Sequence, residues 1–350
     1  MKGGHDMDER VRVGLLGAGG ISRAHIPGYV RCRDRADVVA IAEPVEAAAR
    51  RAQEALGGGT IYGDWRDVLN RSDIDAVDIC LPHDMHEQVA VAAAQAGKHI
   101  LVEKPIARTL AEADAMIAAA DHAGVFLMVC QDRRYHPAFA RMKELVDAGA
   151  IGRPLCLRLD HNQYIKLTPD HWIFQKERLG GGAIMSCLIH QIDLLRWYGG
   201  DVTQVGCMSL TLPERMEGEI IGVVPLRFAS GAIGDAVINW SMEGRGTRSG
   251  LWYELVWLSG TEGNLHNWDG IHVLRHGQAT QSYEPVTFEE GTGHPRAIEH
   301  FLDCVREGRT PLTDGREGRA ALEIAMAAYE SERTGRFINL PLLPQEGVTQ

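Results

Sequence analysis

The sequence predicts an α/β protein in which a doubly wound parallel sheet is followed by an α+β region with a large, mostly antiparallel open sheet. In the first third, apolar strand-like runs alternate with helical stretches of ten or more residues, which is typical of parallel βαβ units. After about residue 150, strand-like runs follow one another through short turns, which favours antiparallel pairing. Because 350 residues are many for one core, we expect two domains, at 8–130 and 131–345.

The first expected strand is the apolar run 11–16, and a helix is expected directly after it at 22–31. A second apolar run predicts a strand at 37–42, and the alanine-rich stretch after it predicts a helix at 44–56. The remaining strands of this part are expected at 74–81, 99–102 and 125–130, and its remaining helices at 86–96 and 110–123. Alternation of this kind places the strands in one parallel sheet.

The second part is expected to consist mainly of strands. They are predicted at 155–160, 202–211, 220–228, 232–240, 251–259 and 270–275. One long helix, 189–197, interrupts them, and helices at 295–307 and 316–334 finish the chain. Turn signals at 229–231 and 259–263 join neighbouring strands through short links.

Charge, hydropathy and cysteine usage limit the classes of partner. The formal net charge of −11 argues against a nucleic acid or an anionic membrane surface. The start, 1–10, is polar and acidic and does not read as a signal peptide, and the most apolar helical stretch, 89–96, is too short to span a bilayer. The seven cysteines are scattered without a Cys-x-x-Cys pair, which indicates reduced thiols in a cytoplasmic protein.

A glycine-rich turn follows the first strand and has the features of a dinucleotide fingerprint. It consists of Gly17, Ala18, Gly19, Gly20, Ile21 and Ser22. Glycines allow the backbone to approach a pyrophosphate, and the next helix presents its N-terminal N–H groups to the phosphates. Glu43 ends the second strand, where a carboxylate binds the adenosine ribose and repels a 2′-phosphate. This favours NAD, while Arg50 and Arg51 leave NADP possible.

Two further residues fit hydride-transfer chemistry. Lys104 lies in Glu103-Lys104-Pro105, downstream of the fingerprint, and is a candidate for stabilising a developing alkoxide. On an expected helix after three glycines, 180–182, Ser186 and His190 would share a face. A histidine titrates near neutrality and suits a proton acceptor. Seen singly, His190 could equally be a structural histidine, and Lys104 could merely cap its turn.

Several motifs together resemble the glucose–fructose oxidoreductase / inositol dehydrogenase / MocA (Gfo/Idh/MocA) family. They are the fingerprint 17–22 and the segments 81–86, 97–105, 134–137, 180–182 with His190, 260–263 and 329–336. The resemblance implies an N-terminal Rossmann domain, an oligomerising C-terminal sheet domain, and sugar or polyol substrates. It assigns catalysis to Lys104 and His190. It also places Leu81, Pro82, His86, Glu103 and Pro105 along the cofactor pocket.

One departure from the family pattern affects the proton chemistry. Ser186 occupies the position of the usual aspartate, and Leu188 that of a glycine. Serine holds no charge at neutral pH, so Lys104 and His190 would carry the proton transfer alone, or an acid elsewhere would substitute.

The expected substrate contacts lie just before the three glycines, and no metal is expected. By family position Asn162, Tyr164 and Trp172 flank the substrate, where polar groups pair with hydroxyls and aromatic faces cover C–H surfaces, although each could instead belong to a solvated loop. Ser186 and Lys104 are expected to contact it too. The pairs His83/His86 and His161/His171 lack a third ligand of fixed spacing.

The leading functional hypothesis is an NAD(P)-dependent dehydrogenase acting on a secondary hydroxyl of a sugar, inositol or related polyol. A redox-neutral lyase or glycosidase with retained NAD would use the same Lys104 and His190. A non-catalytic sensor of nucleotide or sugar on the same fold would need neither. A homodimer or homotetramer is expected because an open sheet face usually needs covering.

Overall fold

The computed structural model describes residues 10–342 except 169, 243–253, 279–281 and 286–292. The chain divides into two compact units, each made of two segments. The first unit is Met1–His136 with Gly291–Arg319, and the second is Pro137–Glu290 with Ala320–Gln350. The expected division at residue 130 cuts the chain once, whereas in the structure the segment 291–319 returns to the first unit. In the described part of the chain, no helix is long and apolar enough to cross a membrane.

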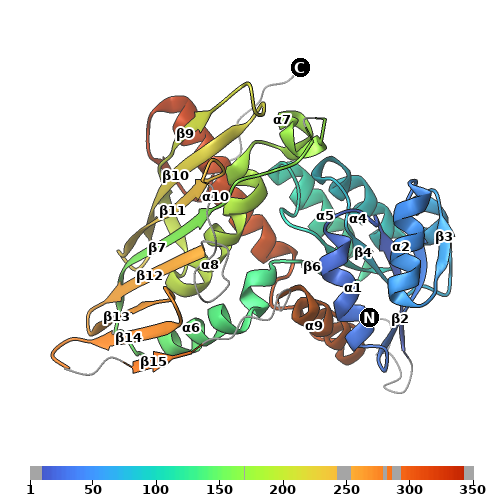
Figure 1. Cartoon of the computed structure of the whole chain (residues 1–350), viewed down its shortest axis with the longest axis horizontal. Helices are drawn as coiled ribbons and strands as arrows, with labels where there is room; N and C mark the ends of the chain where they lie inside the picture. Colours follow the sequence, from blue (N-terminus) through green and yellow to red (C-terminus); the bar gives the residue numbers. More distant parts are fainter. Residues whose placement is uncertain (1–9, 169, 243–253, 279–281, 286–292, 343–350) are drawn as a thin grey trace. The chain divides into compact units, whose positions relative to one another are not determined.

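In the first unit the described residues form a six-stranded parallel sheet flanked by helices (Figure 1). Its order is β3-β2-β1-β4-β5-β6. The strands are β1 (Val11–Leu16), β2 (Ala36–Ala42), β3 (Thr60–Tyr62), β4 (Ala76–Ile79), β5 (His99–Val102) and β6 (Leu127–Val129). The helices that follow them are α1 (Ser22–Arg31), α2 (Glu46–Leu56), α3 (Trp65–Leu69), α4 (His86–Gln95) and α5 (Leu110–Ala123). The order reverses direction at β1, which is the usual place for a ligand crevice.

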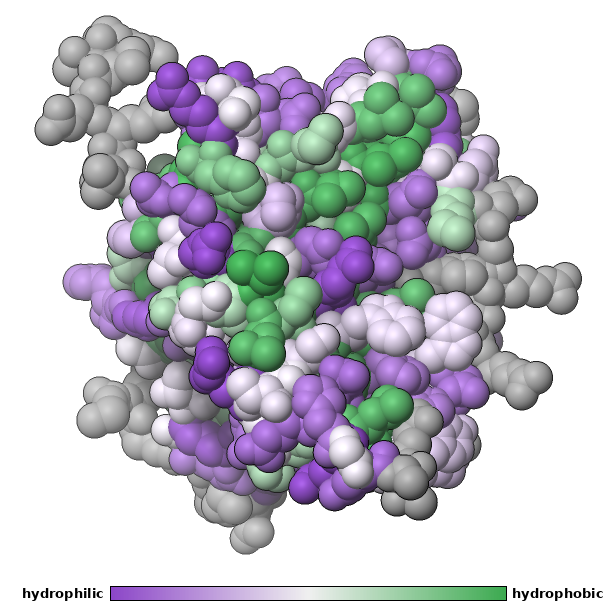
Figure 2. Space-filling model, turned by 90° about the vertical axis from the view of Figure 1, so that its left-hand side faces the viewer, coloured by the Kyte–Doolittle hydropathy of each residue, from purple (hydrophilic) through white to green (hydrophobic). Residues whose placement is uncertain are grey.

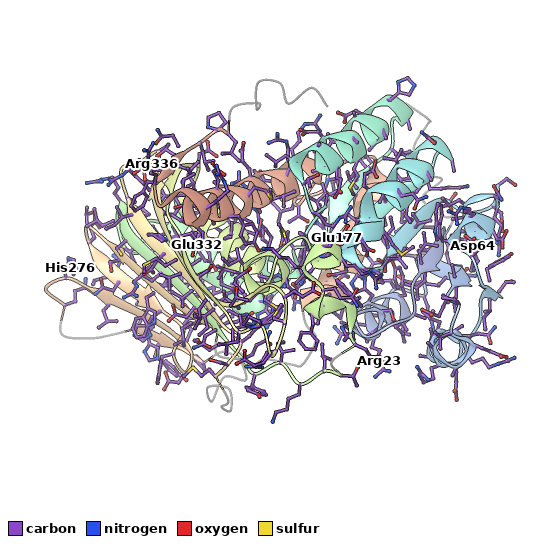
Figure 3. All side chains as sticks on the ribbon, turned by 90° about the horizontal axis from the view of Figure 1, so that it is seen from above. Arg23, Asp64, Glu177, His276, Glu332 and Arg336 are labelled. Atoms are coloured by element: carbon purple, nitrogen blue, oxygen red, sulfur yellow. The ribbon has the colours of Figure 1, made fainter. Side chains whose placement is uncertain are left out.

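Local sequence signals explain where these helices begin and end. Thr109 caps α5 by accepting a hydrogen bond from the N–H of Glu112, and Gly124 ends the helix in the left-handed conformation at φ 66°. Asp64 caps α3 in the same way, accepting from Arg66 N–H, and is labelled in Figure 3. Gly57 ends α2 at φ 78°.

Helix α9 (Gly293–Glu307) completes the first unit by packing on α1. A Cβ on Gly28 would lie 2.8 Å from the Ile298 side chain, so the two helices approach more closely than any larger residue allows. Ile298, Phe301 and Leu302 join the buried cluster that includes Val11 and Leu101. The segment 291–319 is therefore part of this core.

The second unit contains a ten-stranded sheet in the described residues, with α6 (Pro137–Asp147) and α8 (Ile189–Gly199) on one side (Figure 1). Its main order is β15-β14-β13-β12-β7-β11-β10-β8-β16, with β9 paired to β10. The strands are β7 (Pro154–Asn162), β8 (Val202–Val205), β9 (Met208–Thr211), β10 (Glu219–Phe228), β11 (Ile233–Asn239), β12 (Glu254–Gly260), β13 (Gly263–His266), β14 (Ile271–Arg275), β15 (Ser282–Glu284) and β16 (Ile338–Asn339). Among the described pairings here, only β7–β11 is parallel.

Smaller elements lie at the ends and links of this unit. Short helices η3 (Trp172–Phe174) and α7 (Lys176–Leu179) precede a π-helical turn, η4 (Ile184–Leu188), which runs into α8. Helix α10 (Gly315–Thr334) begins in the first unit and continues into the second. His276, labelled in Figure 3, lies in the turn after β14.

The predicted fold class is confirmed, and several predicted bounds are wrong in detail. The run 202–211 forms two strands, β8 and β9, which both pair with β10 and are separated by Gly206 and Cys207; Gly206 N–H still donates to Pro225 O at 2.8 Å, so the chain continues along β10. Strand β3 and helix α3 were not predicted, since each is only a few residues long. The predicted strand 251–259 begins at Glu254 among the described residues, and 251–253 lie outside them.

Candidate functional site

In the first unit the glycine turn between β1 and α1 forms an open cradle. Gly17 has φ +94°, and a Cβ there would lie 2.4 Å from the carbonyl oxygen of Cys80, so only glycine fits. A Cβ on Gly19 or Gly20 would meet no atom within 4 Å. Packing does not require glycine at these two positions, and the free space beside the backbone fits the pyrophosphate of a dinucleotide.

Glu43 lies against this cradle at the end of β2. One carboxylate oxygen accepts a hydrogen bond from Ala18 N–H at 2.8 Å, and the other accepts from Val45 N–H at 2.9 Å. Its position fits the binding of ribose hydroxyls beside the pyrophosphate. Arg50 instead pairs with Glu46, at 2.6 and 2.9 Å, on an exposed part of α2. Ile21 immediately precedes α1.

The loops after β4 and β5 are joined by His86. This side chain is fully buried, and its ring nitrogens lie 2.9 Å from the carbonyl oxygen of Leu81 and 3.0 Å from that of Pro105. Burial lowers the pKa of His86. The imidazole therefore lies between the two loops, and as a neutral ring it donates a hydrogen bond to one of the two carbonyl oxygens at a time. Pro82 precedes the short helix η1 (His83–Met85), which lies in the loop between β4 and α4.

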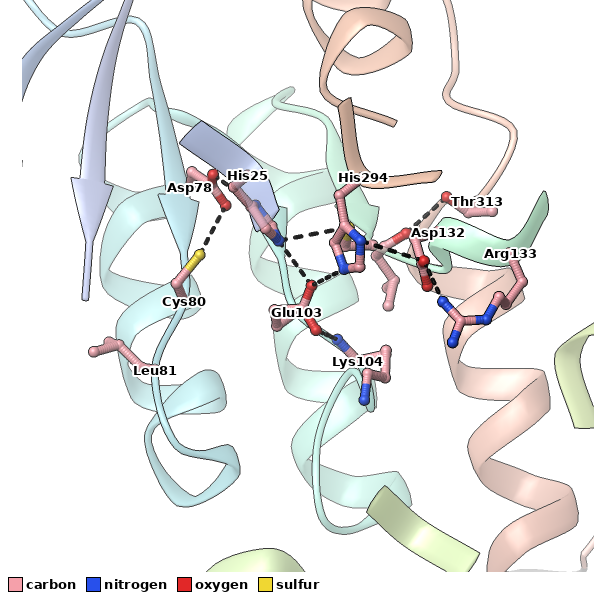
Figure 4. A network of polar contacts seen from close by, with 12 residues as sticks. His25, Asp78, Cys80, Leu81, Glu103, Lys104, Asp132, Arg133, His294 and Thr313 are labelled. Atoms are coloured by element: carbon pink, nitrogen blue, oxygen red, sulfur yellow. Dashed lines mark hydrogen bonds and ion pairs between the residues drawn. The ribbon is translucent and has the colours of Figure 1, made fainter. Parts of the chain in front are cut away.

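Lys104 follows β5 and is half-buried. Its backbone N–H donates to Glu103 Oε2 at 3.3 Å. Glu103 is buried, with 4% of its surface exposed, and its carboxylate lies between the His25 ring and the backbone N–H of Lys104 (Figure 4). Burial opposes its charge, yet hydrogen bonding to His25 and nearby positive charges hold the pKa of Glu103 well below its usual value.

Behind this turn His25, on α1, bridges two buried carboxylates (Figure 4). Its Nδ1 lies 2.9 Å from Asp78 Oδ2, and its Nε2 lies 2.9 Å from Glu103 Oε1. Tyr29 donates to the same Asp78 oxygen at 3.0 Å. Burial works against a charged imidazole, but the neighbouring Asp78 outweighs it and raises the pKa of His25 well above its usual value.

The same network reaches α9 and the loop after β6. His294 Nδ1 lies 3.3 Å from Asp132, and its Nε2 lies 3.8 Å from Glu103. Arg133 pairs with Asp132 at 2.5 Å. Among the described residues, His25, Glu103, Cys130 and His294 form a group whose candidate ligand atoms all lie within 4.8 Å of one another. No sequence motif predicts this group or His25, although Asp78, an acid within a buried strand, is a usable signal.

In the second unit the three glycines lead into the helix that carries His190. The Tyr329 hydroxyl accepts from Gly182 N–H at 3.1 Å and Met185 N–H at 3.2 Å, and donates to Glu219 at 2.9 Å. A Cβ on Gly181 would lie 2.1 Å from the same hydroxyl oxygen. Burial raises the pKa of both Tyr329 and Glu219. Tyr329 and the buried Glu219 anchor the start of the helix, and no sequence motif predicted this contact.

Ser186 lies in the π-helical turn and His190 in the first turn of α8. Both side chains are buried, at 4% and 5% exposed. Ser186 and His190 therefore lie on either side of a change from π-helix to α-helix. The prediction that they share one face assumed a continuous α-helix, which the structure does not have here. Single π turns are frequent at functional sites.

The expected substrate residues lie near the end of β7 and just beyond it. Asn162 ends the strand, and the neighbouring Gln163 donates to Cys187 Sγ at 3.4 Å, which joins this segment to the π-helical turn. Tyr164 is 41% exposed, with the Arg215 guanidinium 4.5 Å from its ring centre. Trp172 lies in η3 and is half-buried.

Comparison with known proteins assigns the family. Residues 11–131 match an oxidoreductase family with an NAD-binding Rossmann fold, and residues 139–266 match the Gfo/Idh/MocA C-terminal domain. The chain belongs to the Gfo/Idh/MocA oxidoreductase family. It is similar to a D-apiose dehydrogenase from Paraburkholderia graminis, with 30% identity over 97% of this chain and 92% of that protein. It is also similar to a scyllo-inositol 2-dehydrogenase (NAD(+)) from Bacillus subtilis, with 29% identity over 95% and 97%.

This Gfo/Idh/MocA protein is also similar to a solved structure over nearly its whole length. A levoglucosan dehydrogenase in complex with NADH and levoglucosan has a TM-score of 0.87 and 27% identity, covering 95% of this chain and 100% of that one. The recognised family, the fold class and the NAD cofactor are confirmed. Within the first unit, the structure brings Glu43 to the glycine cradle and Leu81 to His86 and Pro105.

Proposed function

We propose that this oxidoreductase uses NAD to oxidise one secondary hydroxyl of a sugar, inositol or related polyol. The place of Lys104 carries the proposal. It follows β5 at the same carboxyl edge of the parallel sheet where β1 and β2 end in the glycine cradle and Glu43. Ligands of such sheets bind outside this edge. The relatives named as apiose and inositol dehydrogenases support a carbohydrate or polyol substrate.

Lys104 and His190 divide the work on the substrate hydroxyl. NAD supplies the acceptor for the hydride that leaves the carbon. The Lys104 ammonium donates a hydrogen bond to the hydroxyl oxygen and stabilises its growing negative charge. A ring nitrogen of His190 takes the hydroxyl proton, so a carbonyl product, a proton and a reduced cofactor balance the reaction. Ser186 orients the substrate through its hydroxyl, since it cannot relay charge.

Substrate selection is assigned to Asn162, Tyr164 and Trp172 in the second unit. The Asn162 amide both donates and accepts, as vicinal hydroxyls require. The rings of Tyr164 and Trp172 offer apolar faces for the C–H side of a sugar. Pro82, Leu81 and Pro105 are assigned to the cofactor pocket of the first unit, together with Gly17, Gly19, Gly20, Ile21 and Glu43.

The test is NADH absorbance with purified protein, NAD or NADP, and a panel of monosaccharides, inositols and glycosides. We expect a substrate-dependent rise with NAD, and a loss of about a hundredfold or more in Lys104→Ala. Lys143→Ala, at a lysine of α6 that pairs with Asp147 of the same helix and lies outside the proposed site, serves as the control. No rise, with nucleotide released on denaturation, would favour a redox-neutral lyase with retained NAD or a sensor.

We also propose a cytoplasmic homodimer or homotetramer. All seven cysteines lie in the described part of the chain, and each is a free thiol.

The side of the molecule shown in Figure 2 carries a band of hydrophobic residues among polar ones. Exposed apolar side chains of the second unit include Met208, Ile233, Trp257, Trp268 and Tyr283. A subunit covering such a surface would remove it from water. Sedimentation equilibrium tests the assembly, and a monomer at micromolar concentration would overturn it.

A further inference from the structure

His25 faces a carboxylate at each of its two ring nitrogens. Both distances are 2.9 Å, and both the imidazole and Asp78 are fully buried. An ionised carboxylate only accepts hydrogen bonds, so two of them are satisfied together only when both ring nitrogens carry protons. The chemistry of the contacts therefore specifies an imidazolium, which also compensates the buried negative charge.

A shared proton explains this geometry better than a bound metal ion. Around a tetrahedral zinc with bonds of about 2.0–2.3 Å, neighbouring ligand atoms lie about 3.3–3.7 Å apart. Here His25 Nε2 and Glu103 Oε1 are 2.9 Å apart, which is a hydrogen-bond distance, while Cys130 Sγ is 3.8 Å from the same nitrogen. The other nitrogen is occupied by Asp78.

The hydrogen bonds of His25 connect helix α1, which begins at the glycine cradle, with Glu103, the residue before Lys104. His25 belongs to α1, the helix that opens at the glycine cradle. Glu103 uses its other oxygen to accept the backbone N–H of Lys104 at 3.3 Å. Tyr29, one helical turn after His25, fixes Asp78 at 3.0 Å. A displacement of the His25 ring would therefore shift the Lys104 turn relative to the cradle.

We propose that His25 is a positioning residue, which as an imidazolium between Asp78 and Glu103 fixes the Lys104 turn in register with the dinucleotide cradle. This inference rests on the proposed function, because its consequence is measured on turnover. The titratable groups that face the ring come from every neighbouring element. They are Tyr29 on α1, Asp78 and Cys80 at β4, Glu103 after β5, Cys130 after β6 and His294 on α9.

The first experiment compares His25→Gln with His300→Gln. His300 is a half-buried histidine of α9 in the same unit that lies outside the network and accepts from Leu312 N–H. We expect His25→Gln to lower kcat between about tenfold and a hundredfold, as a small displacement of a catalytic group does. The KM for the substrate and the Kd for NADH, read by fluorescence, should change less than about threefold. His300→Gln should leave all three unchanged.

The second experiment separates positioning from a general role in folding. Asp78→Asn keeps a hydrogen-bond acceptor for His25 but removes the charge that keeps it protonated. The kcat ratio of Asp78→Asn to wild type should fall as pH rises from about 6 to about 9, while the ratio for His25→Gln stays flat. Titration of the imidazole nitrogens by heteronuclear NMR should show His25 doubly protonated at about pH 8 in the wild-type protein.

Several results would overturn the positioning role. They are an unchanged kcat in His25→Gln, equal losses in His300→Gln, a loss of NADH affinity matching the loss of kcat, or a flat ratio for Asp78→Asn. A neutral His25 at neutral pH, or one equivalent of metal in the purified protein, would overturn the imidazolium. If the wild-type protein turns over no substrate, the proposed function itself fails, and the NMR titration and NADH binding tell these two failures apart.

Discussion

At the scale of single residues, sequence motifs predicted the candidate site groups, and the buried network behind them became visible only in the structure. Glu43 and Lys104 were predicted because each stands beside a recognisable turn. Asp78 and Glu103 follow His25 by 53 and 78 residues in the chain, and only the folded sheet brings each carboxylate to 2.9 Å from the His25 ring. A buried ion pair leaves no periodic pattern in a sequence. The lone acid in the strand Ala76–Ile79 was the available signal.

The charged bridge predicts a specific dependence of stability on pH. The pKa of His25 is raised in the folded protein, so its stabilising contribution is complete below about pH 6.5 and is lost as pH rises through the folded-state pKa. The difference in unfolding free energy between wild type and His25→Gln should therefore shrink above about pH 6.5, by at most about 1.4 kcal/mol per pH unit. Urea denaturation at several pH values measures it. A difference that grows with pH would contradict the assignment.

At the scale of elements, apolar periodicity predicted long strands and helices well, and local exceptions arose from contacts. Helix α1 and strands β1 and β5 have the predicted bounds. The π-helical turn at Ile184–Leu188 was not predictable, because the constraints on it come from Tyr329 and Glu219, which follow it by more than thirty residues. Such long-range side-chain contacts to backbone N–H groups override the local α-helical pattern.

The anchor of this turn can be tested by removing one oxygen. Tyr329→Phe deletes the acceptor of two backbone N–H groups and the donor to the buried Glu219, in three part-buried hydrogen bonds. We expect a loss of about 1–3 kcal/mol in unfolding free energy and a lower kcat, because unpaired buried polar groups are costly. Tyr283→Phe, which removes a hydroxyl from a side chain that is 49% exposed, is the matched control. Equal stability of the two variants in thermal denaturation would refute the anchor.

At the scale of the whole molecule, the two-domain organisation was predictable from length and the change of pattern, but the return of 291–319 to the first unit was not. Helix α9 has an ordinary amphipathic sequence, which shows that one face is buried without showing against what. The close contact between Gly28 and Ile298 shows that α9 packs against α1. That Gly28 of α1 faces Ile298 of α9 becomes visible only once the partner helix is known.

Gly28→Ala tests this return. The added Cβ would lie 2.8 Å from Ile298 and 3.0 Å from the Pro295 backbone, so α9 must shift. We expect a loss of about 1–3 kcal/mol, as overpacking of a core produces. Ile298→Ala, which removes the fully buried side chain on the other side of this contact, is expected to lose about 2–5 kcal/mol. Gly231→Ala is the comparison variant, because Gly231 lies in an exposed turn with open space around it. Its loss of stability measures the backbone strain of alanine at positive φ without any steric clash. Differential scanning calorimetry on the three variants decides whether α1 and α9 are packed as described.

The two-segment construction of the first unit also determines when during synthesis that unit can be completed. His294 and the α9 core residues belong to a segment made after the whole of 137–290, so the early part of the unit emerges from the ribosome without them. At about 5–20 residues per second, the wait lasts on the order of 10–40 s. During that interval the α1 surface around Gly28 and the carboxylates near His25 lack their final partners. Until α9 is made, the apolar surface that it later covers stays open to water and to other chains.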